Sequence, residues 1–274
     1  MVTPQHNDKD LLGQLLFQIS GQLRTPLGNI HSALTHLAPP ERRELDPELD
    51  RNAALLSQSY YQLLRFANNL SDAAAFSSAD ALPLRSGDLF QLCRELYLRV
   101  EPLTKMRGQS LHFLFSGDQT VTSFNQDGIE RLVLNLLSNS MKFTPSGGAI
   151  TLSLSITEET VELSVSDTGC GISQDLLPIL FDRYLHPERI DPAPHGLGLG
   201  LPICQWIAGG HGGTLSAVSA EGVGTQVTLT FPNRQSPTAT VRDVPFDYTG
   251  GFNPTLVELA DALPVDAFTH EYLD

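Results

Sequence analysis

The feature that most restricts the fold is an apolar repeat near the start of the chain, with spacings that alternate between four and three residues. The repeat runs through residues 10–37 and again through 47–76. Its members are Leu12, Leu16, Ile19, Leu23, Pro26, Ile30, Ala33 and Leu37, then Leu49, Ala53, Leu56, Tyr60, Leu63, Ala67, Leu70 and Ala74. This spacing is typical of the seam between helices packed side by side. Because Pro39 and Pro40 separate the two runs, residues 8–78 are predicted to form an antiparallel helical hairpin.

A single hairpin buries little apolar surface. The apolar residues of the repeat form a stripe along it, and this stripe needs another surface to pack against. We expect two copies of the chain to pair into a four-helix bundle. The alternative is that the stripe packs on the second domain of the same chain.

The composition narrows the class of protein. The formal net charge is −14, which argues against nucleic acid as a partner because an acidic surface offers no counter-charge to phosphate. The three cysteines have no CxxC spacing, so neither a disulfide framework nor a zinc site is expected. No stretch approaches the ~18 consecutive apolar residues that a membrane-spanning helix needs. We therefore expect a cytoplasmic protein with no membrane span and no signal peptide.

A second domain is predicted over residues 84–232, where helical and alternating patterns are interspersed. Helices are expected at 87–106, 127–143 and about 199–209, and strands at 110–115, 121–124, 149–156, 160–166, 214–219 and 225–231. This arrangement predicts an α/β sandwich. With the N-terminal hairpin, the fold class is α+β.

Residues 233–274 form an acidic tail with several prolines. Asn253 can cap a short helix that begins at Pro254 and extends to residue 263. Two interpretations stay open for the tail: a disordered, solvated segment, or a short helix that docks on its own chain or on a partner.

Four local patterns in the second domain carry the candidate chemistry. In the first, Asn135, Asn139 and Lys142 follow one another at i, i+4 and i+7, so one helix face presents them together. An amide oxygen is a suitable ligand for Mg²⁺, and a neighbouring lysine can neutralise phosphate charge. The second pattern, Asp167-Thr-Gly-Cys-Gly171, follows a strand and places a carboxylate beside two glycines that allow close approach of a ligand.

The third and fourth patterns are Leu180-Phe-Asp-Arg-Tyr184 and Gly196-Leu-Gly-Leu-Gly-Leu201. The latter is a glycine-rich loop that leads into a helix, whose free N–H groups suit a phosphate. Each pattern by itself has an ordinary structural explanation. All four in one order, within about 65 residues, point to a nucleotide site.

This order resembles the catalytic and ATP-binding domain of two-component histidine kinases, the ATPase fold shared with gyrase, over residues 85–232. The resemblance implies ATP and Mg²⁺ as cofactors. It implies that Asn139 holds Mg²⁺, that Asn135 supports the phosphate–metal cluster, and that Lys142 reaches the phosphates. The remaining implied nucleotide contacts are Phe143, Asp167 at the adenine amine, Gly169 and Gly171 in the adenine pocket, Arg183, and a lid formed by Gly196, Gly198 and Gly200.

The first domain resembles the same family at Phe17–Leu27, which is similar to the phosphoacceptor helix normally written Ser-His-Glu-Leu-Arg-Thr-Pro-Leu. Gly21 stands at the position of the histidine and Gln22 at that of the acidic residue. On the seam described above, Gly21 faces solvent, where a phosphoacceptor belongs. Glycine offers no nucleophile, and glutamine cannot take a proton.

The preferred hypothesis is therefore a dimeric signalling protein that binds ATP–Mg²⁺ and lacks the usual phosphoacceptor. In one alternative the chain is an active enzyme: a kinase that uses another acceptor, such as His31 or His36, or a phosphatase of a response regulator that uses Thr25 and Gln22. A stand-alone ATPase of the same fold is a further alternative, which the heptad hairpin disfavours.

Overall fold

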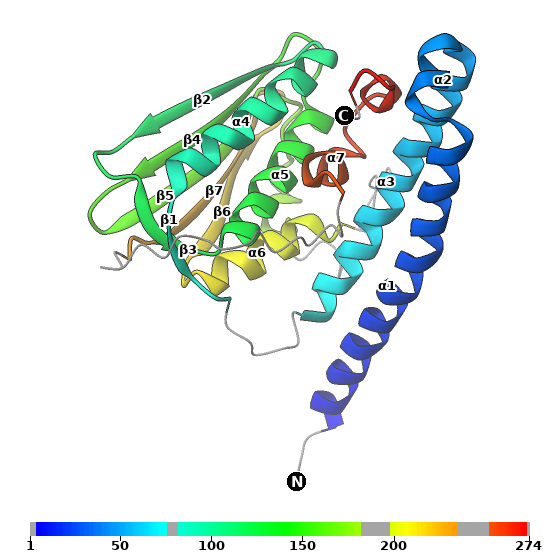
Figure 1. The fold of residues 1–274 in the computed structure, drawn as a ribbon. Helices are drawn as coiled ribbons and strands as arrows, with labels where there is room; N and C mark the ends of the chain where they lie inside the picture. Colours follow the sequence, from blue (N-terminus) through cyan, green and yellow to red (C-terminus); the bar gives the residue numbers. More distant parts are fainter. Residues whose placement is uncertain (1–3, 76–81, 182–197, 235–251, 273–274) are drawn as a thin grey trace. The chain divides into compact units, whose positions relative to one another are not determined.

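The computed structural model describes residues 4–75, 82–181, 198–234 and 252–272. The chain divides into two compact units (Figure 1). The helical unit combines residues 1–80 with 249–274, and the second unit comprises residues 81–248. The second unit is thus inserted, in sequence, between two parts of the first.

The helical unit is built on the hairpin. Its helices are α1 (Pro4–Leu37), the short α2 (Pro40–Leu45) and α3 (Pro47–Ala75). The repeat predicted the two long helices, whereas α2 lies in the stretch that was predicted to be a loop. Pro40 is its first residue, a position where proline costs a helix nothing.

The predicted seam divides between two surfaces of the hairpin. Inside the hairpin, α1 contributes Ser20 and Leu27, which are buried, while Leu16 and Leu23 are half-buried; Ala38, directly after α1, is also buried. The other members of the predicted seam on α1, from Ile19 to Leu37, are exposed; Leu37 is 70% exposed. On α3, Leu56 and Leu63 are 55% and 51% exposed. The hairpin therefore keeps an exposed apolar stripe on both long helices.

The C-terminal residues pack against the hairpin. They form α7 (Pro254–Leu259) and the 3₁₀ helix η4 (Val265–Phe268), and both contact α3. The side chain of Asn253 accepts hydrogen bonds from the N–H groups of Thr255 and Leu256, which caps α7. Of the two interpretations of the tail, the structure has the docked helix, and α7 ends four residues before the predicted position 263.

The second unit is a two-layer sandwich. Its elements are β1 (Arg85–Asp88), α4 (Leu89–Met106), β2 (Ser110–Ser116), β3 (Val121–Phe124), α5 (Gln126–Phe143), β4 (Ala149–Ile156), β5 (Thr160–Asp167), the 3₁₀ helix η1 (Leu177–Ile179), α6 (Gly200–Gly210), β6 (Thr214–Ala220) and β7 (Gly224–Pro232). A five-stranded sheet has the order β2-β4-β5-β7-β6, and β1 pairs with β3 separately. Helices α4, α5 and α6 cover one face of the large sheet (Figure 1). The predicted α+β class is confirmed.

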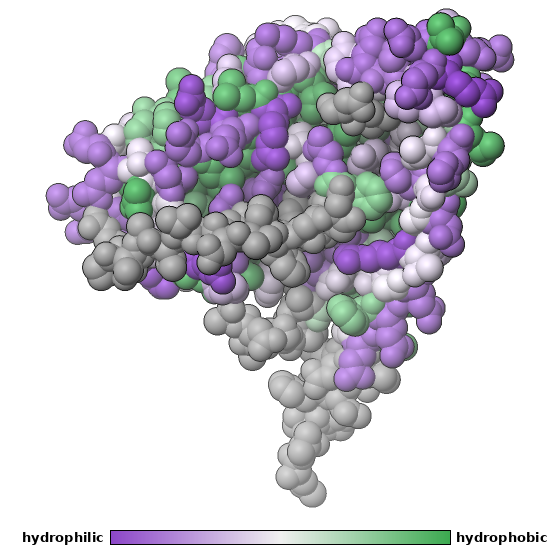
Figure 2. Space-filling view, in the orientation of Figure 1, coloured by the Kyte–Doolittle hydropathy of each residue, from purple (hydrophilic) through white to green (hydrophobic). Residues whose placement is uncertain are grey.

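The sheet forms because its strands alternate in burial. Along β4 every second residue is buried, namely Ile150, Leu152, Leu154 and Ile156. These side chains meet the apolar stripe of α5 to form the core. The visible surface is mainly hydrophilic with small apolar areas (Figure 2), as expected for a chain with 31 acidic and 17 basic residues. No helix within the described residues is long and apolar enough to cross a membrane.

Candidate functional site

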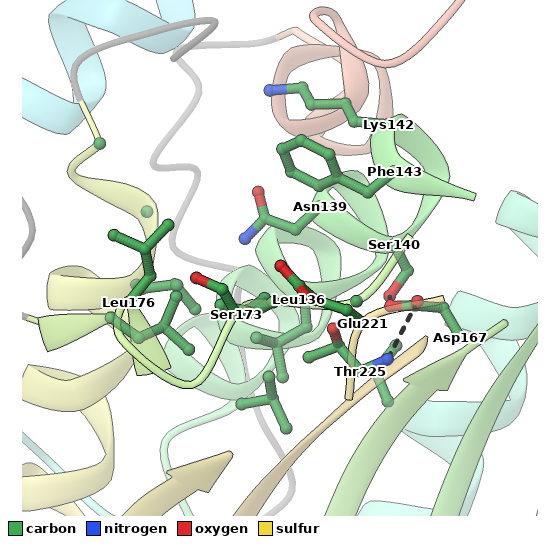
Figure 3. A pocket seen from close by; sticks show the side chains of 18 residues that line it. Leu136, Asn139, Ser140, Lys142, Phe143, Asp167, Ser173, Leu176, Glu221 and Thr225 are labelled. Carbon is green, nitrogen blue, oxygen red and sulfur yellow. Dashed lines mark hydrogen bonds between the residues drawn. The ribbon is translucent and has the colours of Figure 1, made fainter. Parts of the chain in front are cut away.

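A pocket of about 340 Å³ opens in the second unit, between α5, the end of β5 and the start of α6. Apolar side chains line its walls: Leu136, Val165, Ile172, Leu176, Leu180, Leu201 and Val227. In Figure 3, Asp167 lies on one side with Ser140 and Thr225, and Leu176 and Ser173 lie on the other. An apolar slot with a few polar groups suits a flat aromatic ligand such as a purine.

Asp167, the last residue of β5, is the best-defined polar group of the pocket. Its Oδ1 accepts hydrogen bonds from the N–H groups of Gly169, at 2.9 Å, and Thr225, at 3.2 Å. Its Oδ2 accepts one from the hydroxyl of Ser140 at 3.0 Å. A carboxylate can accept about four hydrogen bonds. Since three are used, Asp167 keeps one acceptor position, on Oδ2, for a donor on a ligand.

The loop after Asp167 is held close to its neighbours. Gly171 has a φ of +69°, and a side chain at this position would collide with the carbonyl of Ala220. The N–H of Cys170 donates to the carbonyl of Phe143 at 3.2 Å, and that of Ile172 donates to the hydroxyl of Ser219 at 2.8 Å. These contacts fix the floor of the pocket beside Asp167.

Helix α5 supplies further residues of the pocket. Asn139 and Lys142 line it, as does Phe143, which the resemblance implied. Asn135 does not line it but lies buried one turn earlier, where its Nδ2 donates to the carbonyl of Arg131 at 3.1 Å. Its Oδ1 is turned toward α6, 2.8 Å from the point that a Cβ on Gly200 would occupy. Glycine at position 200 is thus what allows the start of α6 to approach Asn135.

The start of α5 is fixed by two side chains. Asn125 caps the helix, with its Oδ1 accepting from the N–H of Gly128 at 2.7 Å. The N–H of Asn125 itself donates to Nε2 of His211 at 2.9 Å, and the other ring nitrogen lies 2.7 Å from the carbonyl of Ile207. Because Nε2 accepts, Nδ1 must carry the proton, and the ring is neutral. Burial of the ring and the nearby charge of Arg234 lower the pKa of His211, although the Ile207 carbonyl opposes this shift.

The predicted glycine loop is only partly described. Gly198 and Gly200 line the pocket, and Gly198 has a φ of +68°. Gly169 lies next to the pocket and donates to Asp167. Arg183 and Gly196 lie outside the described residues, as does Tyr184.

Some residues of the pocket were not predicted as site residues. Ser140 and Thr225 both contact Asp167, and Ser173 and Glu221 line the pocket. Thr225 was assigned only to the closing strand. Its approach follows from the register of β5 and β7, which places Asp167 opposite Thr225. Ser140 directly follows Asn139, so the sequence predicted its place on α5. Its hydrogen bond to Asp167 could not be predicted from the sequence.

The residues of the segment that resembles a phosphoacceptor helix lie in the helical unit. Gly21, Gln22 and Thr25 are all exposed on α1, and a Cβ at Gly21 would have nothing within 4 Å. Between Gln22 and Thr25, Arg24 donates to Oδ1 of Asn68 at 3.0 Å, which ties this turn of α1 to α3. Of the two histidines, His36 is exposed. His31 stacks on Tyr60 with ring centroids 4.8 Å apart, and burial lowers its pKa.

The donors at the pocket fit a magnesium nucleotide better than a metal bound by protein alone. No group of three or more His, Cys, Asp or Glu side chains gathers in the described parts of the chain. Mg²⁺ is commonly held by one or two protein oxygens together with phosphates and water. Asn139 and Lys142 both line the pocket, so an amide oxygen and a cation are available there for this kind of partial ligand set.

Comparison with known proteins agrees with this geometry. Residues 124–235 match the family described as "Histidine kinase-, DNA gyrase B-, and HSP90-like ATPase". The sensor histidine kinase WalK of Bacillus subtilis is 30% identical over 244 residues, which is 85% of this chain and 39% of WalK. The adaptive-response sensory kinase SasA of Synechococcus elongatus is 37% identical over 117 residues, or 42% of this chain and 30% of that protein. The chain spans less than half the length of these relatives.

Solved structures extend the similarity to most of the chain. The full-length structure of ShkA in complex with AMPPNP has a TM-score of 0.65 and 25% identity, and covers 83% of this chain and 47% of ShkA. Histidine kinase ThkA in complex with the response regulator TrrA shares the fold, with a TM-score of 0.55 and 20% identity over 84% of this chain and 64% of that one. The heptad hairpin, the ordered motifs around the pocket and these similarities lead to one conclusion. The chain belongs to the two-component sensor histidine kinase family, and its second unit holds the ATP-binding domain.

Proposed function

We propose that the chain binds ATP with Mg²⁺ in the pocket of the second unit and acts as a dimeric regulator that does not phosphorylate itself at position 21. The observation that carries the nucleotide part is the single acceptor position left on Asp167 at the end of an apolar slot. The 6-amino group of adenine is a donor of the right kind for it. Guanine would place its 6-oxo group there, against a carboxylate, so the pocket favours adenine.

The other end of the nucleotide would meet α5 and the start of α6. Asn139 would hold the metal, with Asn135 in support, and Lys142 would neutralise phosphate charge. Phe143 would pack beside the nucleotide, and Gly196, Gly198 and Gly200 would form the lid. Arg183 would also contact the nucleotide, because it belongs to the motif Leu180–Tyr184.

The regulator part of the proposal follows from Gly21 and Gln22. Position 21 is open to solvent with free space around it, so geometry would not prevent phosphorylation there, but glycine has no atom that can accept a phosphoryl group. Gln22 cannot provide acid–base assistance. Signalling would then proceed through conformation and docking, with a response regulator or another signalling protein as the partner.

A second copy of the chain is the proposed occupant of the apolar stripe. Ile19, Ile30 and Leu37 are exposed by 47%, 50% and 70% on α1, beside Leu56 and Leu63 on α3. Pairing two such hairpins would remove this surface from water, at roughly 25 cal/mol for each Å² of apolar area.

An enzymatic role is the second candidate. Thr25 is exposed one helical turn after Gly21, next to Gln22, so its hydroxyl and the Gln22 amide could orient a water for hydrolysis of a phosphorylated regulator. Of the alternative phosphoacceptors, His36 is exposed, whereas His31 is stacked in an aromatic cluster. Hydrolysis of regulator phosphate that disappears in Thr25→Ala would favour the phosphatase role.

Calorimetric titration with ATP, in the presence and absence of Mg²⁺, tests the nucleotide part. Asp167→Asn should weaken ATP binding by about 10- to 100-fold, because an amide cannot replace a charged acceptor of several donors. Asp118→Asn removes an exposed charge in a turn and serves as the matched control. Equal affinities of wild type and Asp167→Asn would contradict the proposed orientation of the base.

A further inference from the structure

The C-terminal segment makes a series of directed contacts with the hairpin. Its aromatic residues provide the first set. The ring of Phe252 lies edge-on to His31, with centroids 5.0 Å apart, and also contacts Tyr60 and Tyr61. Phe268 packs on Tyr61 with centroids 5.6 Å apart. Two aromatic anchors, sixteen residues apart in sequence, therefore converge on neighbouring tyrosines of α3.

Charged groups provide the second set of contacts. Arg65 of α3 lies 3.5 Å from Glu258 and 3.0 Å from Asp261, both from the segment. Arg43 of α2 donates to the carbonyl of Phe268 at 2.8 Å. In this set the hairpin contributes the cations and the segment contributes the acids and a carbonyl, so the contacts are complementary in charge.

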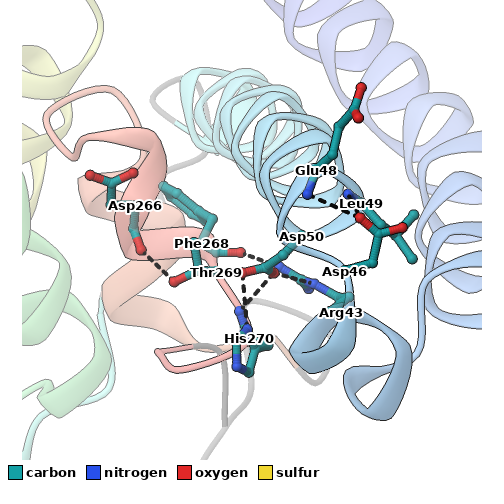
Figure 4. A network of polar contacts seen from close by, with 9 residues as sticks. All are labelled: Arg43, Asp46, Glu48, Leu49, Asp50, Asp266, Phe268, Thr269 and His270. Atoms are coloured by element: carbon teal, nitrogen blue, oxygen red, sulfur yellow. Dashed lines mark hydrogen bonds and ion pairs between the residues drawn. The ribbon is translucent and has the colours of Figure 1, made fainter.

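The third set of contacts fixes the register of the segment on α3, and Figure 4 shows those around Asp50. Asp50 accepts a hydrogen bond from the N–H of His270 at 3.1 Å, and its other oxygen lies 2.9 Å from the imidazole of His270. The same carboxylate accepts from Arg43 at 2.7 Å. Further along, Gln58 donates to the carbonyl of Leu263 at 2.8 Å.

These contacts use a face of α3 that is separate from the exposed apolar stripe. The contacting residues are Asp50, Gln58, Tyr60, Tyr61 and Arg65, which span an arc of ~160° at 100° per residue. Leu56 and Leu63 lie outside this arc, ~40° and ~60° beyond Tyr60, and stay exposed. The helix therefore has one face that the C-terminal segment covers and, next to it, an apolar stripe that stays open.

We propose that residues 252–270 form a C-terminal clasp, a displaceable ligand of the hairpin supplied by the same chain. The binding surface on α3 (Asp50, Gln58, Tyr60, Tyr61 and Arg65) is specific for an acidic segment with two aromatic anchors. Because the second unit lies between the hairpin and the clasp in sequence, docking attaches both of its ends to the hairpin, and release leaves one attachment. While the clasp is docked, it covers this face of α3, so a protein partner can bind the hairpin only at its other surfaces.

A ligand on the same chain acts at an effective concentration set by the chain that joins it to its site, which adds to the contacts that keep it docked. Residues 235–251 join the second unit to the clasp and can span at most ~60 Å. The linker limits how far the clasp can lie from the second unit, and docking on the hairpin of a second copy is the alternative to be tested.

Crosslinking distinguishes the two occupants. The full-length chain would carry Gln58→Cys and Leu263→Cys in a Cys170→Ser background, since Cys170 is the exposed native cysteine and Cys93 and Cys204 are buried. With a short bifunctional maleimide we expect an intrachain product. Covalent dimers would overturn the assignment to the same chain. In the control, Ser59→Cys replaces Gln58→Cys at an exposed neighbouring position; equal crosslinking in both chains would overturn docking on this face.

Hydrogen exchange tests whether the clasp is displaceable. Phe268→Ala removes one aromatic anchor, and amides of residues 254–268 should then exchange on the order of 100-fold faster. Amides of α1 and of the second unit should keep their rates. Asp266→Asn, an exposed position in the same 3₁₀ helix, is the matched control and should change nothing. Unchanged exchange in Phe268→Ala, or faster exchange throughout the hairpin, would overturn the proposal, the latter because the segment would then be an integral part of the helical core.

Discussion

The hydroxyl of Ser140 donates to Oδ2 of Asp167 at 3.0 Å, across 27 residues of sequence and between α5 and β5. This contact orients the carboxylate and leaves it one acceptor position toward the pocket. It joins the helix that carries Asn139 to the residue proposed to read the base, so the two ends of the nucleotide site are mechanically linked.

Ser140→Ala should therefore weaken ATP binding by about 3- to 15-fold, the loss expected for one hydrogen bond to a charged group that no longer holds its orientation. Discrimination against GTP should fall as well, because a loosely held carboxylate can turn away from a 6-oxo group. Titration calorimetry with both nucleotides measures the two effects. Ser216→Ala, on the exposed side of edge strand β6, is the control. Unaltered affinity and discrimination in Ser140→Ala would show that Asp167 is oriented without it.

His211 should make the stability of the second unit depend on pH. Its pKa in the folded protein lies below the ordinary value of 6.5, chiefly because the ring is buried. The unfolded chain thus binds the proton more readily. Stability is full above about pH 6.5 and decreases as the pH falls from there toward the folded-state pKa. Protonation would also remove the acceptor for the N–H of Asn125 at the start of α5.

Thermal unfolding of wild type and His211→Gln between pH 7.5 and 5.5 measures this effect. We expect the melting temperature of the second unit to fall with pH in wild type and to fall less in His211→Gln, which keeps an acceptor but cannot be protonated. Equal slopes for the two chains would assign the pH dependence to other groups.

Gly21 has a cost to α1 that can be measured independently of any signalling role. A helical glycine on an exposed face destabilises a protein by up to ~1 kcal/mol relative to alanine. Since a Cβ at this position meets nothing within 4 Å, Gly21→Ala should raise the free energy of unfolding of the helical unit by about that amount. Urea denaturation followed by circular dichroism provides the measurement. Destabilisation by Gly21→Ala would mean that position 21 is packed against another surface.

The proposed dimer predicts a strong effect at Leu63, which is 51% exposed in the single chain. Leu63→Glu would bury a carboxylate in the bundle, which costs several kcal/mol, so the dimer dissociation constant should rise at least ~100-fold. Gln62→Glu makes the same change in charge at the neighbouring position and should have little effect. Sedimentation velocity distinguishes the states; a Leu63→Glu chain that sediments like wild type would contradict the bundle.

Much of this architecture was readable in the sequence because it depends on local periodicity. The strands at 149–156 and 160–166 alternate clearly, and the spacing of Asn139 and Lys142 on α5 brought both into the pocket. What was not readable depends on distant partners. The Ser140–Asp167 contact requires the packing of α5 on β5, and the role of Arg43 requires the C-terminal segment, 225 residues away at Phe268.

The hairpin shows the limit of pattern analysis most clearly. Ile19 and Leu27 are both apolar, but only Leu27 is buried inside the hairpin, because the rotation of α1 about its axis is set by packing against α3. The repeat identified the helices correctly and left the choice between the inner and outer surfaces undetermined. Likewise, the six residues of α2 are too few to show a period, and α2 was missed.

The central claim is that the ATP site is intact while the phosphoacceptor is missing. Incubation of the full-length chain with γ-labelled ATP tests it most directly, with wild type compared with a chain that carries Gly21→His and Gln22→Glu. The free space at position 21 allows the imidazole to reach solvent. We expect acid-labile label on α1 in the substituted chain and none there in wild type. Acid-labile label on α1 of the wild-type chain would contradict the claim.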